Sequence, residues 1–347
     1  MRKRNLFFII FTMVGGGLFF WLVQRIGWDK IAEVFTLFQW WHLVILLGLY
    51  FLSMIFMSLS MRLILKSLGY RLPFLTIFAL TNINLAVGYI TPFAYVGGEP
   101  VQIYLMYKRY RVPVGTGTAN VLIEKVTRQL IAMIFIVFGV ILFIFNQEIP
   151  WGIRIGLAAF ISFLIFVLWA YFAKSISGEG FFHYMIKIFH LSRWKILNNP
   201  KVAPVITDID RRTSDFLVKH RRAFGLCLIY ATLAELVPIA QMILVFWFMG
   251  INPGIVNIFL LFIVTNLLTF VPSPAQLGTF EASGVSVFAI KGIGAGAGLT
   301  WSVYLHIINI LSTIPGLVLL PIYGLTIKEA VFNGEEMQRK ISGKNIK

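Results

Sequence analysis

Long apolar runs, almost free of charge, constrain this chain more than any other feature of its sequence. Six of them are clear: Leu6–Val23, Trp41–Met61, Arg128–Phe145, Gly152–Ala173, Ala223–Met249 and Leu299–Tyr323. Helical runs of about this length match the hydrocarbon thickness of a bilayer. A transmembrane β-barrel would instead show short segments of alternating polarity. The sequence therefore predicts an all-α polytopic membrane protein.

Composition agrees with this class and excludes others. Of the 347 residues, 59% are hydrophobic and 13% are charged, whereas soluble domains carry about 25% charged residues. Soluble enzyme folds, nucleic-acid-binding modules and disordered chains are therefore excluded. The net charge of +16 raises the question of which side of the membrane holds the basic residues. We expect membrane lipids as partners, and no nucleic acid.

The N-terminal segment resembles a secretory signal peptide, because Arg2-Lys3-Arg4 precedes the first apolar run. That run, Leu6–Val23, is longer than the ~7–15 apolar residues of a signal peptide and lacks a small-residue cleavage site. We therefore expect it to be a retained first span.

Two further apolar stretches, Leu75–Val96 and Val256–Ile290, are interrupted by Pro, Gly, Asn and Glu. If both crossed the membrane, the basic residues of 108–111 and 174–222 would lie opposite the basic N-terminus, against the positive-inside rule. If each stretch returns to the face it entered, 24 of the 30 Lys and Arg residues lie in the cytoplasm and 4 lie outside. We therefore predict about six full transmembrane helices and two re-entrant helical hairpins. Both termini are then cytoplasmic, in the inner membrane of a bacterium or archaeon.

An internal repeat supports this topology. Asn84-Leu85, Pro92 and Glu99 recur 182 residues later as Asn266-Leu267, Pro274 and Glu281. The same offset relates span boundaries, which places repeat 1 at about 41–145 and repeat 2 at about 223–327 within a single transmembrane domain, 1–347. Three crossings separate the two interrupted stretches, so they enter from opposite faces. The sequence thus predicts an inverted-topology repeat, which is typical of transporters with a mid-membrane site.

Carboxylates in apolar surroundings are the first candidate functional residues. An ionised group at the bilayer centre costs about 2.5–3.5 kcal/mol, so Glu99 and Glu281 must face a cavity, find a partner or be protonated. Glu99 precedes Pro100, a sequence that suits the start of a helix. The two carboxylates either cap the return helices of the hairpins or line a translocation path, and the two roles are compatible.

A second candidate cluster consists of Glu124, Lys125 and Arg128. Glu124 and Arg128 are spaced to pair on one helix face, which leaves a surplus positive charge suited to a phosphate. The alternative is a set of side chains that snorkel to the interface. His306 corresponds to Glu124 at the repeat offset and lies within the predicted span Leu299–Tyr323.

Other polar residues point to packing more than to chemistry. Asn84 and Asn266 are typical of hydrogen bonds between membrane helices. The five histidines show no metal-ligand spacing, and the single cysteine, Cys227, can form no intrachain disulfide. We therefore expect no cofactor and no metal.

The sequence Pro-Phe-Ala-Tyr-Val-Gly-Gly-Glu-Pro at 92–100, followed by Glu124-Lys125, resembles the lysylphosphatidylglycerol synthase transmembrane family of flippase-like membrane proteins. A second signature follows at 272–282, and the resemblance covers about residues 5–325. It implies a membrane region associated with moving lipids between leaflets. The chain ends about twenty residues after its last predicted span, so we expect a stand-alone member without the soluble synthase domain. Gln102 stands where arginine is common, which weakens the case for anion binding at that turn.

We therefore expect a transporter-like protein, and no enzyme, that moves an anionic phospholipid or a polyprenyl-phosphate-type lipid across the bilayer. No ATP-binding motif is present, so movement is passive or driven by an ion gradient. A secondary transporter for a small polar solute is the main alternative. A non-transporting anchor subunit with a cytoplasmic partner at the amphipathic loop 174–222 is another, and a homo-oligomer is compatible with the sequence. The residues predicted to bind or move the substrate are Asn84, Pro92, Glu99, Glu124, Lys125, Arg128, Asn266, Pro274, Gln276, Glu281 and His306.

Overall fold

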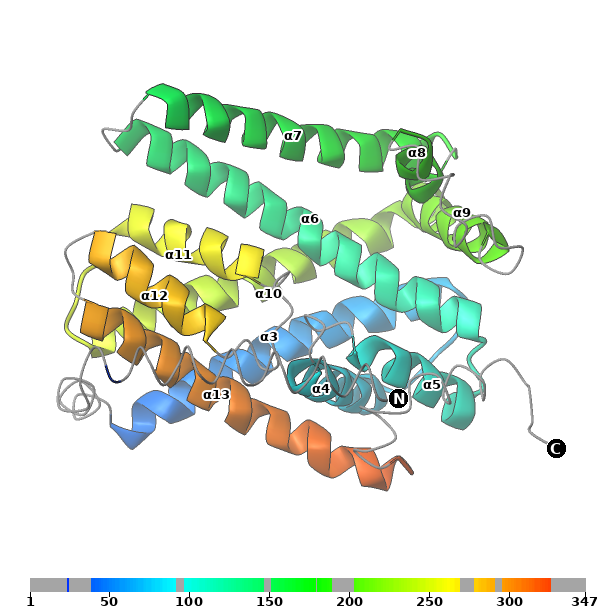
Figure 1. Ribbon diagram of the computed structural model, residues 1–347. Helices are drawn as coiled ribbons and strands as arrows, with labels where there is room; N and C mark the ends of the chain where they lie inside the picture. Colours follow the sequence, from blue (N-terminus) through cyan, green and yellow to red (C-terminus); the bar gives the residue numbers. More distant parts are fainter. Residues whose placement is uncertain are drawn as a thin grey trace, which may run out of the picture. The chain divides into compact units, whose positions relative to one another are not determined.

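The computed structural model describes residues 24, 39–91, 97–146, 151–178, 180–188, 203–268, 278–290 and 295–325. Within these ranges all regular secondary structure is helical, as predicted (Figure 1). The helices, in chain order, are α3 (Trp40–Ser67), α4 (Phe74–Ile90), α5 (Gly98–Tyr110), α6 (Val114–Asn146), α7 (Trp151–Ile176), α8 (Phe181–Ile188), α9 (Ala203–Lys219), α10 (Arg221–Phe248), α11 (Ile255–Leu268), α12 (Thr279–Ile290) and α13 (Ala295–Ile322).

Five of these helices are long and apolar enough to cross a membrane, namely α3, α6, α7, α10 and α13. They cover five of the six predicted spans, and the prediction of an all-α, multi-pass membrane protein is confirmed. The other predicted span, Leu6–Val23, lies outside the described residues.

The first interrupted stretch contains the short helix α4 and is followed by α5, whereas the second contains the short helices α11 and α12. α4 and α11 have 17 and 14 residues, which correspond to about 25 and 21 Å of helix. The hydrocarbon core is about 30 Å thick, so neither helix fills it when straight and upright. α4 ends at Ile90, and Pro92 follows two residues later, in keeping with the restriction that proline places on the residue before it. Pro272 and Pro274, which follow α11, lie outside the described residues.

The helix boundaries repeat along the chain. α3, α4, α5 and α6 begin at residues 40, 74, 98 and 114, and α10, α11, α12 and α13 begin at 221, 255, 279 and 295. Every start thus recurs 181 residues later, one residue from the offset of 182 that the side chains give. Helix ends are assigned to within one or two residues, so the two offsets agree.

Several helices end in the same hydrogen-bonded turn. After α3, the N–H of Tyr70 donates to the carbonyl of Leu65 at 3.0 Å, and Gly69 has a φ of 92°. This is the Schellman motif, in which glycine takes the left-handed conformation. α5 ends in the related αL motif without glycine: Arg111 takes the left-handed conformation with a φ of 56°, and its N–H donates to the carbonyl of Tyr107 at 3.1 Å. Left-handed geometry at a non-glycine residue costs about 1–2 kcal/mol.

The chain divides into two compact units, which are described separately. Unit 1 consists of Met1–Ile55, Phe78–Leu105 and Ala234–Lys347, and unit 2 consists of Phe56–Ile77 and Met106–Leu233. Each unit thus takes segments from both sequence repeats.

In unit 1, α12 packs against both α11 and α13. A Cβ atom added to Gly284 would lie 2.6 Å from the carbonyl oxygen of Gly298, so the backbones of α12 and α13 touch. Small residues allow such close approach in membrane helices. The ring of Phe246, from α10, stacks on that of Phe288 at 5.1 Å, and Trp301 is fully buried.

In unit 2, α6 packs against α7 and α9, and α8 packs against both α7 and α9. Figure 1 shows α6 and α7 side by side. The described part of the polar region 174–222 forms α8 and α9. Phe216 of α9 is fully buried in a cluster with Ile64, Ile123 and Cys227. The apolar face of α9 is therefore used within unit 2.

Candidate functional site

Glu281 lies in the first turn of α12, where its side chain binds the end of its own helix. The backbone N–H of Gly278 donates to Glu281 Oε2 at 2.7 Å. This bond is one half of a capping box, in which a carboxylate at the third helical position accepts from the residue that precedes the helix. Glu281 is fully buried. Glu281 therefore caps α12, which is one of the two roles that the sequence suggested for it.

The other carboxylate oxygen of Glu281 faces a histidine. Oε1 lies 2.9 Å from His306 Nε2 on α13, and the two side chains are 1% and 7% exposed. The ring N–H is not aligned with the oxygen, so the contact is an electrostatic one at ion-pair distance rather than a linear hydrogen bond.

Tyr89 of α4 completes the cluster from the far side of the imidazole. Its hydroxyl lies 2.9 Å from His306 Nδ1, and both side chains are buried. If the hydroxyl donates to Nδ1, a neutral imidazole carries its proton on Nε2, which faces Glu281. Tyr89, His306, Glu281 and the Gly278 N–H thus form one continuous chain of polar groups, which we call the buried polar chain. All of its members belong to unit 1.

Aromatic rings surround this chain. Phe280 meets the His306 ring edge-on at 5.3 Å between centroids and stacks on Trp301 at 5.1 Å. Polar groups enclosed by apolar rings depend strongly on one another, because an unpaired buried group loses its hydration without compensation. The three helices α4, α12 and α13 are therefore coupled through a few polar atoms.

A second polar contact of unit 1 joins α4 and α5. Asn84 Nδ2 donates to Gln102 Oε1 at 2.7 Å, and Gln102 is fully buried. The predicted hydrogen bond between helices is confirmed for Asn84. Glu99 lies in the first turn of α5, as its sequence context indicated.

Within the part of the chain that the structure describes, the amide of Asn266 bonds its own helix instead. Asn266 Nδ2 donates to the carbonyl of Phe262 at 2.9 Å. The repeat offset explains the difference. Gln102, the partner of Asn84, corresponds to Gly284, which has no side chain to offer.

The second predicted cluster belongs to unit 2, whereas the buried polar chain belongs to unit 1. Arg128 Nε lies 3.4 Å from Glu124 Oε1, which is the predicted pairing along one helix face. The Glu124 side chain is buried, whereas Lys125 and Arg128 are half-buried. Pro92, Pro274 and Gln276 lie outside the described residues.

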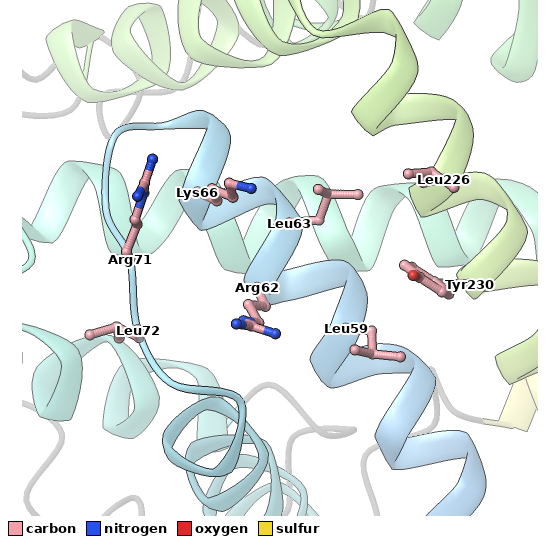
Figure 2. Close-up of a pocket in the computed structure, with 8 residues that line it drawn as sticks. All are labelled: Leu59, Arg62, Leu63, Lys66, Arg71, Leu72, Leu226 and Tyr230. Carbon is pink, nitrogen blue, oxygen red and sulfur yellow. The ribbon is translucent and has the colours of Figure 1, made fainter.

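Sequence reasoning missed two features of the site. Tyr89 has no charge and corresponds to Val271 in the second repeat, so neither hydropathy nor the repeat singled it out. The other is a pocket of unit 2, with a volume of about 370 Å³ (Figure 2). It is lined by Leu59, Arg62, Leu63, Lys66, Arg71, Leu72, Leu226 and Tyr230. The sequence did hold one indication of this pocket: its first four lining residues are spaced so that they fall on one face of α3.

Among the residues that the structure describes, no group of three or more His, Cys, Asp or Glu side chains is arranged to hold a metal ion. The chemistry of the buried polar chain is instead that of hydrogen bonding and proton exchange, since it joins a carboxylate, an imidazole and a phenol.

Fold and site together define a polytopic α-helical membrane protein with a buried polar chain between its helices. Residues 8–316 match the family described as the lysylphosphatidylglycerol synthase TM region. The chain therefore belongs to this family, as the sequence signatures at 92–100 and 272–282 indicated.

One curated relative adds to this comparison. A UPF0104 membrane protein of the archaeon Methanocaldococcus jannaschii is 28% identical over 151 residues. The match covers 42% of this chain and 45% of that relative, so it spans less than half the length of either protein. No solved structure matches the chain.

Proposed function

We propose that this protein moves a lipid between the leaflets of a cytoplasmic membrane and that the buried polar chain belongs to the path of the headgroup. The observation that carries the proposal is the contact of Glu281 with His306 and, through it, with Tyr89 inside a set of apolar helices. An ionisable group at such depth is by default a functional-site hypothesis.

The physical argument starts from the cost of moving a headgroup through hydrocarbon. A lipid headgroup leaves water when it crosses, whereas its tails can stay in lipid throughout. Groups that both donate and accept hydrogen bonds can replace part of the lost hydration. The buried polar chain offers a carboxylate acceptor, a phenolic donor and an imidazole that can do either.

The proposed topology has six crossings, two re-entrant hairpins and both termini in the cytoplasm. Its support is the constant spacing of helix starts between the two repeats and the shortness of α4 and α11. In this topology the repeats are inverted, so the two hairpins enter from opposite faces. We also propose that the protein is a transporter and no enzyme, with transport passive or driven by an ion gradient.

The test is transfer of a fluorescent phospholipid between leaflets of proteoliposomes, with the label in the outer leaflet quenched chemically. Glu281→Gln separates the two roles of the carboxylate, because glutamine keeps an oxygen that can accept from Gly278 but loses the charge. We expect a stable, monodisperse Glu281→Gln protein whose transfer rate falls about tenfold, which corresponds to about 1.4 kcal/mol. His306→Gln should behave in the same way.

Ser312→Ala is the matched control for these variants. Ser312 is a buried polar residue on α13, like His306, and its hydroxyl donates within its own helix to the carbonyl of Asn309. Its loss should leave transfer unchanged. If Glu281→Gln transfers lipid at the normal rate, the carboxylate serves only as a cap. If the wild type moves no phospholipid, with or without a proton gradient, a small polar solute becomes the better substrate class.

A further inference from the structure

The pocket of unit 2 lies where α3 ends and α10 begins. Leu59, Arg62, Leu63 and Lys66 occupy one face of α3, because residues three, four and seven positions apart lie on the same side of a helix. Figure 2 shows these side chains along α3, with Leu226 and Tyr230 presented by α10.

The turn after α3 adds a third cation. The Schellman motif at Gly69 reverses the chain, so that Arg71 and Leu72 return to line the pocket beside the helix they follow. Arg71 is thus placed by hydrogen bonds of the backbone, among them the bond from Tyr70 N–H to the Leu65 carbonyl at 3.0 Å.

The charges of this pocket are all positive. Arg62, Lys66 and Arg71 line it together with uncharged residues, and no carboxylate is among the lining residues. Within the part of the chain that the structure describes, these three cations form no ion pair with an acidic side chain. Like charges held at one site repel one another, and an anion relieves this repulsion. Arginine in particular matches the geometry of phosphate with two parallel hydrogen bonds.

The remaining walls are apolar and point to an amphiphile. Four leucines line the pocket, and Tyr230 adds an aromatic ring with a hydroxyl. Free inorganic phosphate gains nothing from leucine side chains, whereas the glycerol and upper acyl chain of a lipid do. A volume of about 370 Å³ suits a headgroup and lies at the small end of ligand pockets. Both helices that frame the pocket are candidate membrane spans, so it lies at a span end, where lipid headgroups are found.

We infer that this pocket binds the phosphate group of an anionic membrane lipid, with the cations on the phosphate and the leucines along the lipid backbone. The inference rests on the proposed function where it names the substrate class. In the proposed topology the pocket faces the cytoplasm and collects lipid from that leaflet. Binding itself can be measured without transport.

The experiment counts lipids bound to the purified protein by native mass spectrometry. The probes are phosphatidylglycerol and phosphatidylcholine with identical acyl chains, and inorganic phosphate serves as a competitor. Arg62→Gln/Arg71→Gln removes two charges of the pocket. The matched control, Arg221→Gln/Arg222→Gln, removes two exposed charges at the start of α10 that do not line it.

A second pair of variants tests the apolar walls with all charges kept. Leu226→Trp fills part of the pocket, whereas Ile229→Trp places the same bulk at an exposed position of α10 outside it. We expect Arg62→Gln/Arg71→Gln and Leu226→Trp each to weaken phosphatidylglycerol binding about tenfold. Both controls should change it less than twofold, and phosphatidylcholine should bind weakly throughout.

Three outcomes would overturn the inference. Equal losses in the two arginine pairs would mean that diffuse surface charge, and no pocket, attracts the lipid. Displacement of the lipid by millimolar inorganic phosphate would assign the site to the free anion. Equal binding of both phospholipids would remove the anionic preference.

If binding follows the expected pattern but no lipid is transferred between leaflets, the inference about the pocket holds and the proposed function fails. If lipid is transferred between leaflets but does not bind in the pocket, the proposed function holds and the inference about the pocket fails.

Discussion

Gly98, the first residue of α5, lies directly against the backbone of α4. A Cβ atom added there would overlap the carbonyl oxygen of Asn84, so the backbones of α5 and α4 are in contact. The Asn84–Gln102 hydrogen bond lies across the same contact. A single glycine thus holds the two short helices close enough for their side-chain amides to meet.

We expect Gly98→Ala to destabilise the protein by about 1–3 kcal/mol, because the added methyl group forces the two backbones apart. Gly48→Ala is the matched control, since Gly48 lies within α3 and a Cβ atom there would meet nothing within 4 Å. Alanine favours a helix over glycine by up to about 1 kcal/mol, so the control should be neutral or stabilising. Thermal unfolding in detergent measures both, and equal midpoints would contradict the close contact.

At the residue scale, the sequence identified the buried ionisable residues but did not predict which side chains they contact. Glu281 and His306 stood out because ionisable groups are rare in apolar runs, and the structure brings them together. Their contact depends on how α12 packs on α13, through Gly284 and Gly298, which no single-residue pattern encodes. Tyr89 joins them only because α4 reaches the same point, and a tyrosine in an apolar helix attracts no notice.

The beginning of α8 shows how one element depends on a side chain from another. The backbone N–H of His183, in the first turn of α8, donates to Asp210 Oδ2 of α9 at 3.1 Å. Gly180 precedes the helix, and a Cβ atom there would overlap the same carboxylate. Asp210 is buried, so it caps α8 from across the contact between the two helices.

Asp210→Ala should therefore leave the first backbone N–H groups of α8 without their cap and lower the stability of the protein by about 0.5–2 kcal/mol. Hydrogen exchange of the amides of α8 should quicken while those of α6 keep their protection.

Asp208→Ala is the control for this prediction, because Asp208 pairs with Arg211 and Arg212 on its own helix. Partial burial acts to raise the pKa of Asp208, but hydrogen bonds and charges from these two arginines lower it overall. The stability that this lowered pKa supplies is present above the usual aspartate value of about 4 and is lost as the pH falls below it. Exposed pairs contribute about 0.2–1 kcal/mol, so the control should leave α8 unchanged. Equal exchange in both variants would argue against the cap.

At the scale of elements, hydropathy predicted most helices because a bilayer requires spans of defined length. α6 begins at Val114, well before the apolar run that starts at Arg128, so hydropathy located this span but not its first residue. α8 was not predicted as a separate helix, since eight residues give too short a pattern. α5 ends at Tyr110 and is followed by Arg111 where a glycine would have signalled the left-handed turn, so this turn could be recognised only in the structure.

For the molecule as a whole, the distribution of charge makes a prediction about orientation. Cys227 is the single cysteine and is fully buried, so an impermeant maleimide should not label the wild type. Asn252→Cys, in the exposed turn after α10, should be labelled on intact spheroplasts. Lys219→Cys, exposed at the end of α9, should be labelled only after lysis. The reverse pattern would place both termini outside and contradict the positive-inside assignment.

The contact between Glu281 and His306 leads to an expectation about the order of events during biosynthesis. The carboxylate leaves the ribosome 25 residues before the imidazole that faces it. The described helix α12 has 12 residues, or about 18 Å, whereas the hydrocarbon core is about 30 Å thick, and an unpaired charge in it opposes insertion by about 2.5–3.5 kcal/mol. We therefore expect α12 to enter the bilayer together with α13, after the ribosome has passed well beyond Glu281.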